Sequence, residues 1–101
     1  MNPLSVVARG TWLYAHTRPM PVAIVRLDYD YWYEFAKAAN DLEIGDVPRV
    51  DAEGHAYYVS YSNVRDGDTF RPDSVTHLSH GDARADAEAR APSLITWLET
   101  A

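Results

Sequence analysis

The feature that most constrains the fold is a strict alternation of side chains along residues 23–35. Every odd-numbered position in this stretch is apolar or aromatic, which is the two-residue period that a β-strand imposes on its two faces. Aromatic residues, which are frequent in the second half of the stretch, also favour strands. We therefore predict a strand that continues to about Tyr33.

A helix is the competing interpretation for the second half of this stretch. Asp28 could cap such a helix, and four residues would share one helical face: Trp32, Phe35, Ala36 and Ala39. A strand through all of residues 22–35 would also be unusually long. Our prediction is therefore a strand to about Tyr33, followed by a short helix over about residues 34–42.

A second strand is predicted before this stretch, over residues 5–15. Its alternation would place five residues on one face: Val6, Ala8, Gly10, Trp12 and Tyr14. A loop should follow over residues 16–21, because Pro19 and Pro21 cannot donate hydrogen bonds to a sheet.

The second half of the chain completes an α+β pattern. We predict a hairpin over residues 50–61, a short strand over residues 74–78 and a helix from Asp82 with a kink near Pro92. The expected fold is a single domain over residues 1–101. It contains an antiparallel sheet of about four to five strands, a short middle helix and the kinked C-terminal helix, with the helices mainly on one face of the sheet.

Composition excludes several classes of function. The chain has no cysteine, which excludes a disulfide framework and thiolate metal sites. With 9 Lys+Arg against 15 Asp+Glu, its net charge of −6 argues against binding to nucleic acid. The longest stretch without a charged residue, residues 54–64, is too short to span a membrane. We therefore expect a cytoplasmic protein that binds neither nucleic acid nor membrane.

The sequence shows no complete catalytic or metal-binding motif. The carboxylates of Asp28 and Asp30, and the imidazoles of His77 and His80, have spacings found in metal sites, but neither pair has an identifiable further ligand. No serine lies in a Gly-x-Ser-x-Gly elbow, and the glycines form no phosphate-binding loop. We therefore predict no metal and no cofactor, and favour a non-catalytic protein over an enzyme.

The strongest functional signal is the cluster of acids and aromatic residues at positions 28–35. Residues 28–56 alone sum to −6, which equals the net charge of the chain. On a strand, one outward stripe would hold Asp28, Asp30, Trp32 and Glu34. Its carboxylates would attract a basic partner, and its indole would supply contact area. The bland alternative is that the aromatic side chains are core residues and the acids merely solvate the surface.

Our leading hypothesis is a binding or inhibitory module that docks this stripe on a basic protein, because small acidic proteins of this size commonly neutralise toxins or nucleases. An alternative is a ligand-binding protein or enzyme with a pocket between the sheet and the C-terminal helix. That pocket would be lined by Tyr14, His16, Arg26, Tyr31, His55, Tyr57 and Tyr61. A third possibility is a homo-oligomer joined at sheet edges, with basic residues 1–27 facing the acidic middle of a neighbour.

Overall fold

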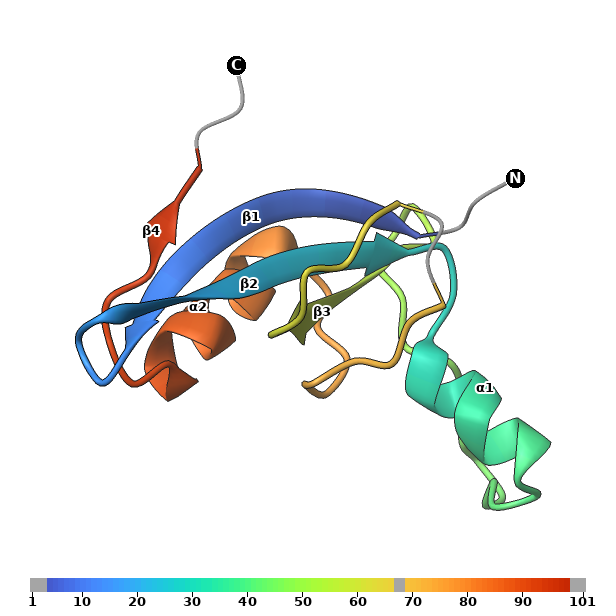
Figure 1. Ribbon diagram of the computed structural model, residues 1–101. Helices are drawn as coiled ribbons and strands as arrows, with labels where there is room; N and C mark the ends of the chain where they lie inside the picture. Colours follow the sequence, from blue (N-terminus) through green and yellow to red (C-terminus); the bar gives the residue numbers. More distant parts are fainter. Residues whose placement is uncertain (1–3, 67–68, 99–101) are drawn as a thin grey trace.

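The fold is built on a long, curved hairpin formed by β1 (Ser5–Tyr14) and β2 (Arg18–Leu27), as Figure 1 shows. The computed structural model describes residues 4–66 and 69–98. Within those residues, β3 (Ala56–Ser60) and β4 (Thr96–Trp97) complete a four-stranded antiparallel sheet in the order β3-β2-β1-β4. Two helices, α1 (Tyr31–Ala38) and α2 (His80–Arg90), make the domain an α+β fold, as predicted.

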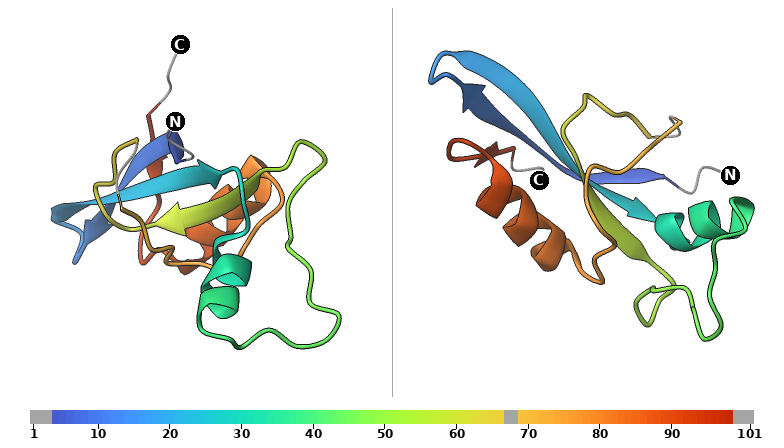
Figure 2. Two further views of the ribbon diagram at one scale, coloured as in Figure 1. Left: turned by 90° about the vertical axis from the view of Figure 1, so that its right-hand side faces the viewer. Right: turned by 90° about the horizontal axis from the view of Figure 1, so that it is seen from below.

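The central strand β2 buries side chains on both faces of the sheet. Val22 and Ile24 face α2, which lies along one face of the sheet in Figure 2 and contributes Ala83 and Ala87 to this layer. The opposite face forms a second core cluster: Leu4, Ala23, Val25, Leu27, Ala56, Tyr58 and Val64. Because both faces of β2 are covered, its second half is buried, and Val22, Ala23, Ile24, Val25 and Leu27 are each no more than 1% exposed.

A bulge in β1 distributes that strand between the two cores. The pairing with β2 shifts register between Val6 and Ala8, which leaves one extra residue on β1. Val6 therefore packs with the first cluster, whereas Ala8 and Trp12 pack on the α2 side. The prediction that these three residues share one face was wrong, since a bulge reverses the alternation beyond it.

The strand predicted to continue to Tyr33 ends at Leu27, and a helix begins at Tyr31. The Asp30 side chain accepts a hydrogen bond from the backbone N–H of Tyr33 at 3.3 Å and so caps α1. The aromatic rings then meet at helical spacing, with Tyr31 stacked on Phe35 at 6.3 Å. The alternation therefore predicted strand correctly only as far as Leu27.

The predicted loop at residues 16–21 was also wrong, because β2 includes Pro19 and Pro21. These prolines pair with Leu13 and Thr11. The N–H of Leu13 points away from β2, where it donates to the Ser93 hydroxyl. The two prolines therefore occupy pairs that exchange no ladder hydrogen bond, which is where a strand tolerates proline.

The remaining differences concern the second half of the chain. Of the predicted hairpin at residues 50–61, the structure forms the turn and β3 but no first strand. Residues 74–78 contribute a single bridge, between His77 and Tyr57. Helix α2 ends at Arg90 and is not kinked at Pro92, because the cap residue Ala91 is already extended. No helix in the described residues is long and apolar enough to cross a membrane.

Candidate functional site

Asp30, predicted to face a partner, is instead a buried structural residue with an exposed fraction of 5%. Its Oδ1 accepts from the hydroxyls of Thr76 at 2.8 Å and Tyr58 at 3.3 Å, besides capping α1. Its Oδ2 accepts from the backbone N–H of Arg49 at 2.8 Å. One carboxylate therefore joins α1, β3 and the segments around residues 49 and 76, and is not available to a ligand.

Trp32 also points into the protein. Its indole N–H donates to the carbonyl oxygen of Ser74 at 2.8 Å, and the Arg71 guanidinium lies 5.8 Å from its ring centroid. The predicted outward stripe is therefore wrong. Trp32 and Glu34 lie on helix α1 and not on a strand, and the side chains of Asp30 and Trp32 are held inside. Only Asp28 and Glu34 are exposed.

The structure brings these two exposed carboxylates to one cavity at the base of α1. The cavity has a volume of about 260 Å³ and lies between the start of α1 and the segment at residues 48–54. Its lining comprises Asp28, Tyr29, Asp30, Tyr33, Glu34, Pro48, Val50 and Gly54. Because the Asp30 carboxylate is already fully engaged, the free charges at the cavity are those of Asp28 and Glu34.

The electrostatic environment of this cavity is negative. Burial raises the pKa of the Tyr29 hydroxyl, and the charges of Asp28 and Glu34 raise that pKa further, with Tyr31 also contributing. None of the described residues that line the cavity is basic. A cation entering this space would therefore meet attractive charge and aromatic surface together.

The cavity belongs to a larger acidic end of the molecule, which we define as residues 28–55. This segment contains eight acidic and two basic residues, and it lies opposite the β1–β2 turn in Figure 1. It also displays isolated aliphatic side chains among its acids. Ile44 is fully exposed and Val47 is 70% exposed.

The alternative pocket predicted between the sheet and α2 is not assembled. Tyr57 and Tyr61 pack in the core layer beneath α2, whereas Tyr31 packs on the opposite face of the sheet. The other four predicted residues are scattered: Tyr14 and His16 lie at the β1–β2 turn, Arg26 lies near the end of β2, and His55 precedes β3. These seven residues therefore do not surround one ligand.

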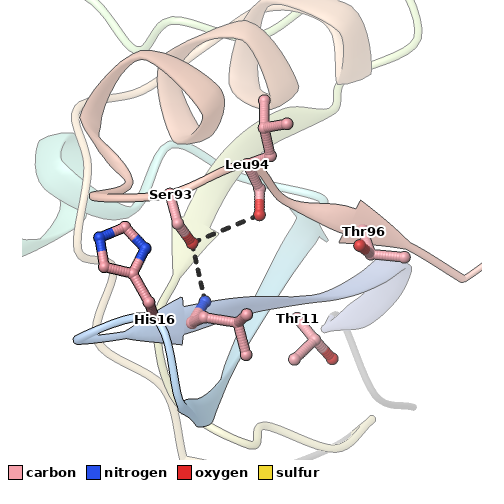
Figure 3. A pocket seen from close by; sticks show the side chains of 6 residues that line it. Thr11, His16, Ser93, Leu94 and Thr96 are labelled. Atoms are coloured by element: carbon pink, nitrogen blue, oxygen red, sulfur yellow. Dashed lines mark hydrogen bonds between the residues drawn. The ribbon is translucent and has the colours of Figure 1, made fainter.

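A wider, open hollow of about 610 Å³ lies at the hairpin end of the molecule (Figure 3). Its lining includes the imidazole of His16 and the hydroxyl of Ser93, a combination that can serve nucleophilic catalysis. The Ser93 hydroxyl, however, accepts from the N–H of Leu13 at 2.8 Å and donates to the carbonyl oxygen of Leu94. No hydrogen bond joins it to His16 within the described chain, so these two side chains are not paired as nucleophile and base.

Two arginines line a third cavity, of about 470 Å³, beside Trp32. Arg71 lies over the rings of Trp32 and Phe35, each at 5.8 Å. Arg90 donates to both carboxylate oxygens of Asp86, whose second oxygen also lies 2.8 Å from His77 Nε2. Arg90 is therefore paired with a carboxylate, and Asp73 adds negative charge to the same lining, which makes this cavity a weaker candidate for an anionic ligand.

The sheet edges were proposed above as oligomer contacts. Among the described residues the edge strands are β3 and β4, and β1 is open only where the two-residue β4 does not cover it. Side chains occupy backbone donors beside β3 and on these open parts of β1. On β1, the N–H of Val6 donates to Asp66 and that of Leu13 to Ser93. On β3, the N–H of Val59 donates to Ser74, and just after β3 the N–H of Tyr61 donates to Asp73. Joining two copies through these edges would require displacing those contacts.

Comparison of the chain with protein-family models, with curated proteins and with solved structures found no match. The site must therefore be interpreted from its own chemistry. Sequence analysis identified Asp28 and Glu34 but missed the opposing wall formed by Pro48, Val50 and Gly54. That wall is brought to α1 by the long-range bond between Asp30 and Arg49, for which no local pattern exists.

Proposed function

We propose that the protein is a non-catalytic binding module that docks its acidic end on a basic protein surface. The observation that carries this proposal is the cavity at the base of α1. It presents the carboxylates of Asp28 and Glu34 beside two tyrosines, with no basic residue in its described lining. Such a surface favours encounter with a positively charged partner and rejects an acidic one.

The aliphatic side chains on the acidic end support a protein as the partner. Ile44 and Val47 protrude from the connection between α1 and β3, with Glu43 and Asp46 close by in the sequence. The N–H of Glu43 donates to the Asp46 side chain at 2.8 Å, which gives this segment a defined turn. Apolar anchors surrounded by charge are the usual arrangement of a protein interface, because burying the anchors supplies affinity and the charges supply orientation.

The proposal is tested with a charge-neutralising pair, Asp28→Asn with Glu34→Gln. Wild-type protein and this variant are used to capture binding proteins from the native host, and the affinity of each captured protein is then measured by calorimetry at two salt concentrations. We expect a basic partner whose affinity falls at least tenfold in the variant and weakens with salt.

The matched control is Asp82→Asn with Glu88→Gln, which removes the same charge from exposed positions on α2. The control should bind the partner as the wild type does. A partner that is acidic, or one that binds the Asp28/Glu34 variant undiminished, would contradict the proposal.

A further inference from the structure

We infer that the cavity at the base of α1 is a slot for one arginine side chain of the partner protein. This inference rests on the proposed docking function and specifies the chemical group that the site receives. It follows from four properties of the cavity: its size, its walls, the charges at its rim and the rigidity of its frame.

The size and the walls suit a long side chain with an apolar stem. A volume of about 260 Å³ corresponds to roughly eight water molecules at about 30 Å³ each, which is ample for the seven heavy atoms of an arginine side chain. Tyr29, Tyr33, Pro48 and Val50 provide the apolar surface. The methylene groups of arginine pack against such surface while the charged head remains near polar groups.

The charges favour a monovalent organic cation. Asp28 and Glu34 are exposed, and both line the cavity, so two carboxylates are free to accept hydrogen bonds there. The third carboxylate, Asp30, is fully used by donors from the protein itself. No group of three or more acidic or histidine side chains among the described residues could hold a metal ion. An occupant that supplies hydrogen-bond donors to two separate carboxylates fits the cavity better.

Arginine satisfies this requirement better than lysine. Its planar guanidinium carries five N–H donors in a fixed fork, stacks on aromatic rings and is weakly hydrated. It can therefore contact a tyrosine ring and two carboxylates at the same time. A lysine ammonium is a compact, strongly hydrated charge that gains less from the tyrosine surface.

The frame of the slot is fixed before any ligand arrives. Asp30 holds one wall through the N–H of Tyr33 and the other through the N–H of Arg49. Asp51 Oδ1 accepts from the N–H groups of Glu53 and His55, each at 2.9 Å, which shapes the turn that carries Gly54. A site whose walls are already ordered loses little conformational entropy on binding.

The test uses blocked amino acids as probes, followed by nuclear magnetic resonance of the backbone amides. N-acetyl-arginine amide should shift residues 28–34 and 48–54 saturably and bind at least fivefold more tightly than N-acetyl-lysine amide. The citrulline analogue, which has nearly the same shape but no charge, should produce no saturable shift. Equal binding of the lysine or citrulline probe, or shifts centred elsewhere, would overturn the inference.

Two variants connect these shifts to the slot. Glu34→Gln should lower the affinity for the arginine probe at least threefold, whereas Asp82→Asn on α2 should leave that affinity unchanged. The amide spectrum of each variant shows whether its fold is intact. If the arginine probe fails to bind while a basic partner still depends on Asp28 and Glu34, the slot is wrong and the docking proposal stands. If the probe binds but no basic partner exists, the cavity selects arginine as inferred, but the docking proposal is wrong, and with it the partner protein as the source of that side chain.

Discussion

The two ends of the sheet use their polar groups in opposite ways. At the α1 end, a single buried carboxylate, Asp30, accepts four hydrogen bonds, and the neighbouring acids Asp28 and Glu34 remain exposed beside a cavity. At the hairpin end, the Ser93 hydroxyl closes the edge of β1. The tight turn there holds two residues with positive φ, Ala15 at 52° and His16 at 62°.

This difference shows that the size of a hollow does not indicate how many polar groups in it are free for a ligand. The hairpin hollow is larger than the cavity at α1, yet its Ser93 hydroxyl is already hydrogen-bonded to the backbone. Its turn is also strained by the two positive φ angles. At the α1 end, by contrast, one buried residue, Asp30, makes the structural hydrogen bonds, and the adjacent Asp28 and Glu34 remain exposed. Three changes test this division, and the largest effect is expected at Asp30.

Replacing Asp30 with alanine should lower the free energy of unfolding by about 3–5 kcal/mol, because it removes a helix cap and leaves several buried donors without acceptors. Asp28→Ala, two residues away and exposed, should change it by no more than about 0.5 kcal/mol. Urea unfolding followed by circular dichroism measures both. Comparable losses in the two variants would contradict the division between structural and free carboxylates.

Raising the pH should lower the free energy of unfolding, because Tyr58, which lies beside Asp30, loses its proton. Burial raises the pKa of Tyr58 to about 12, so its protonated hydroxyl is favoured in the folded protein. This contribution is complete below pH 10, the ordinary value, and is lost as pH rises toward 12, by about 3 kcal/mol in total.

The comparison of wild type with Tyr58→Phe isolates this effect. At pH 8 the variant should be the less stable protein, because Tyr31 loses the acceptor for its backbone N–H. The difference should shrink between pH 10 and 12, as the wild-type hydroxyl ionises. A difference in unfolding free energy that stays constant across this range would show that Tyr58 titrates normally.

The smallest expected change is a gain at the hairpin end. Replacing Ala15 with Asn and His16 with Gly should raise the free energy of unfolding by about 1 kcal/mol, because these residues tolerate the positive φ that this turn requires. Thermal unfolding measures the gain. An unchanged or lower melting temperature would mean that the Ala-His turn is not strained.

Strands β1, β2 and β3 were predictable in part from the sequence because their signal is local, whereas β4 lies where the C-terminal helix was predicted. The alternation along residues 23–27 gave the central strand, and the α+β class followed from the order of patterns. The start of α1 was missed because the aromatic residues at positions 29–35 fit both the period of a strand and that of a helix. The hydrogen bonds of Asp30, which cap α1 and tie it to Arg49, favour the helix. The bulge at Val6 and Ala8 was missed since it depends on the pairing with β2.

The candidate site was predictable only in part, for the same reason. Asp28 and Glu34 were identified from their charge. Charge could not distinguish them from Asp30, whose carboxylate is buried. What distinguishes Asp30 is a set of partners 19 to 46 residues away. Such contacts exist only once the chain has folded.

The side chains that close the edges of the sheet have a consequence for how this protein avoids aggregation. An open strand edge is a template on which other chains can add strands and begin cross-β assembly. Here the side-chain oxygen atoms of Asp66 and Ser93 accept from backbone N–H groups of β1 that an incoming strand would need. Those of Ser74 and Asp73 accept from Val59 on β3 and from Tyr61 just after it. Strand addition at these positions would first have to displace four side-chain acceptors.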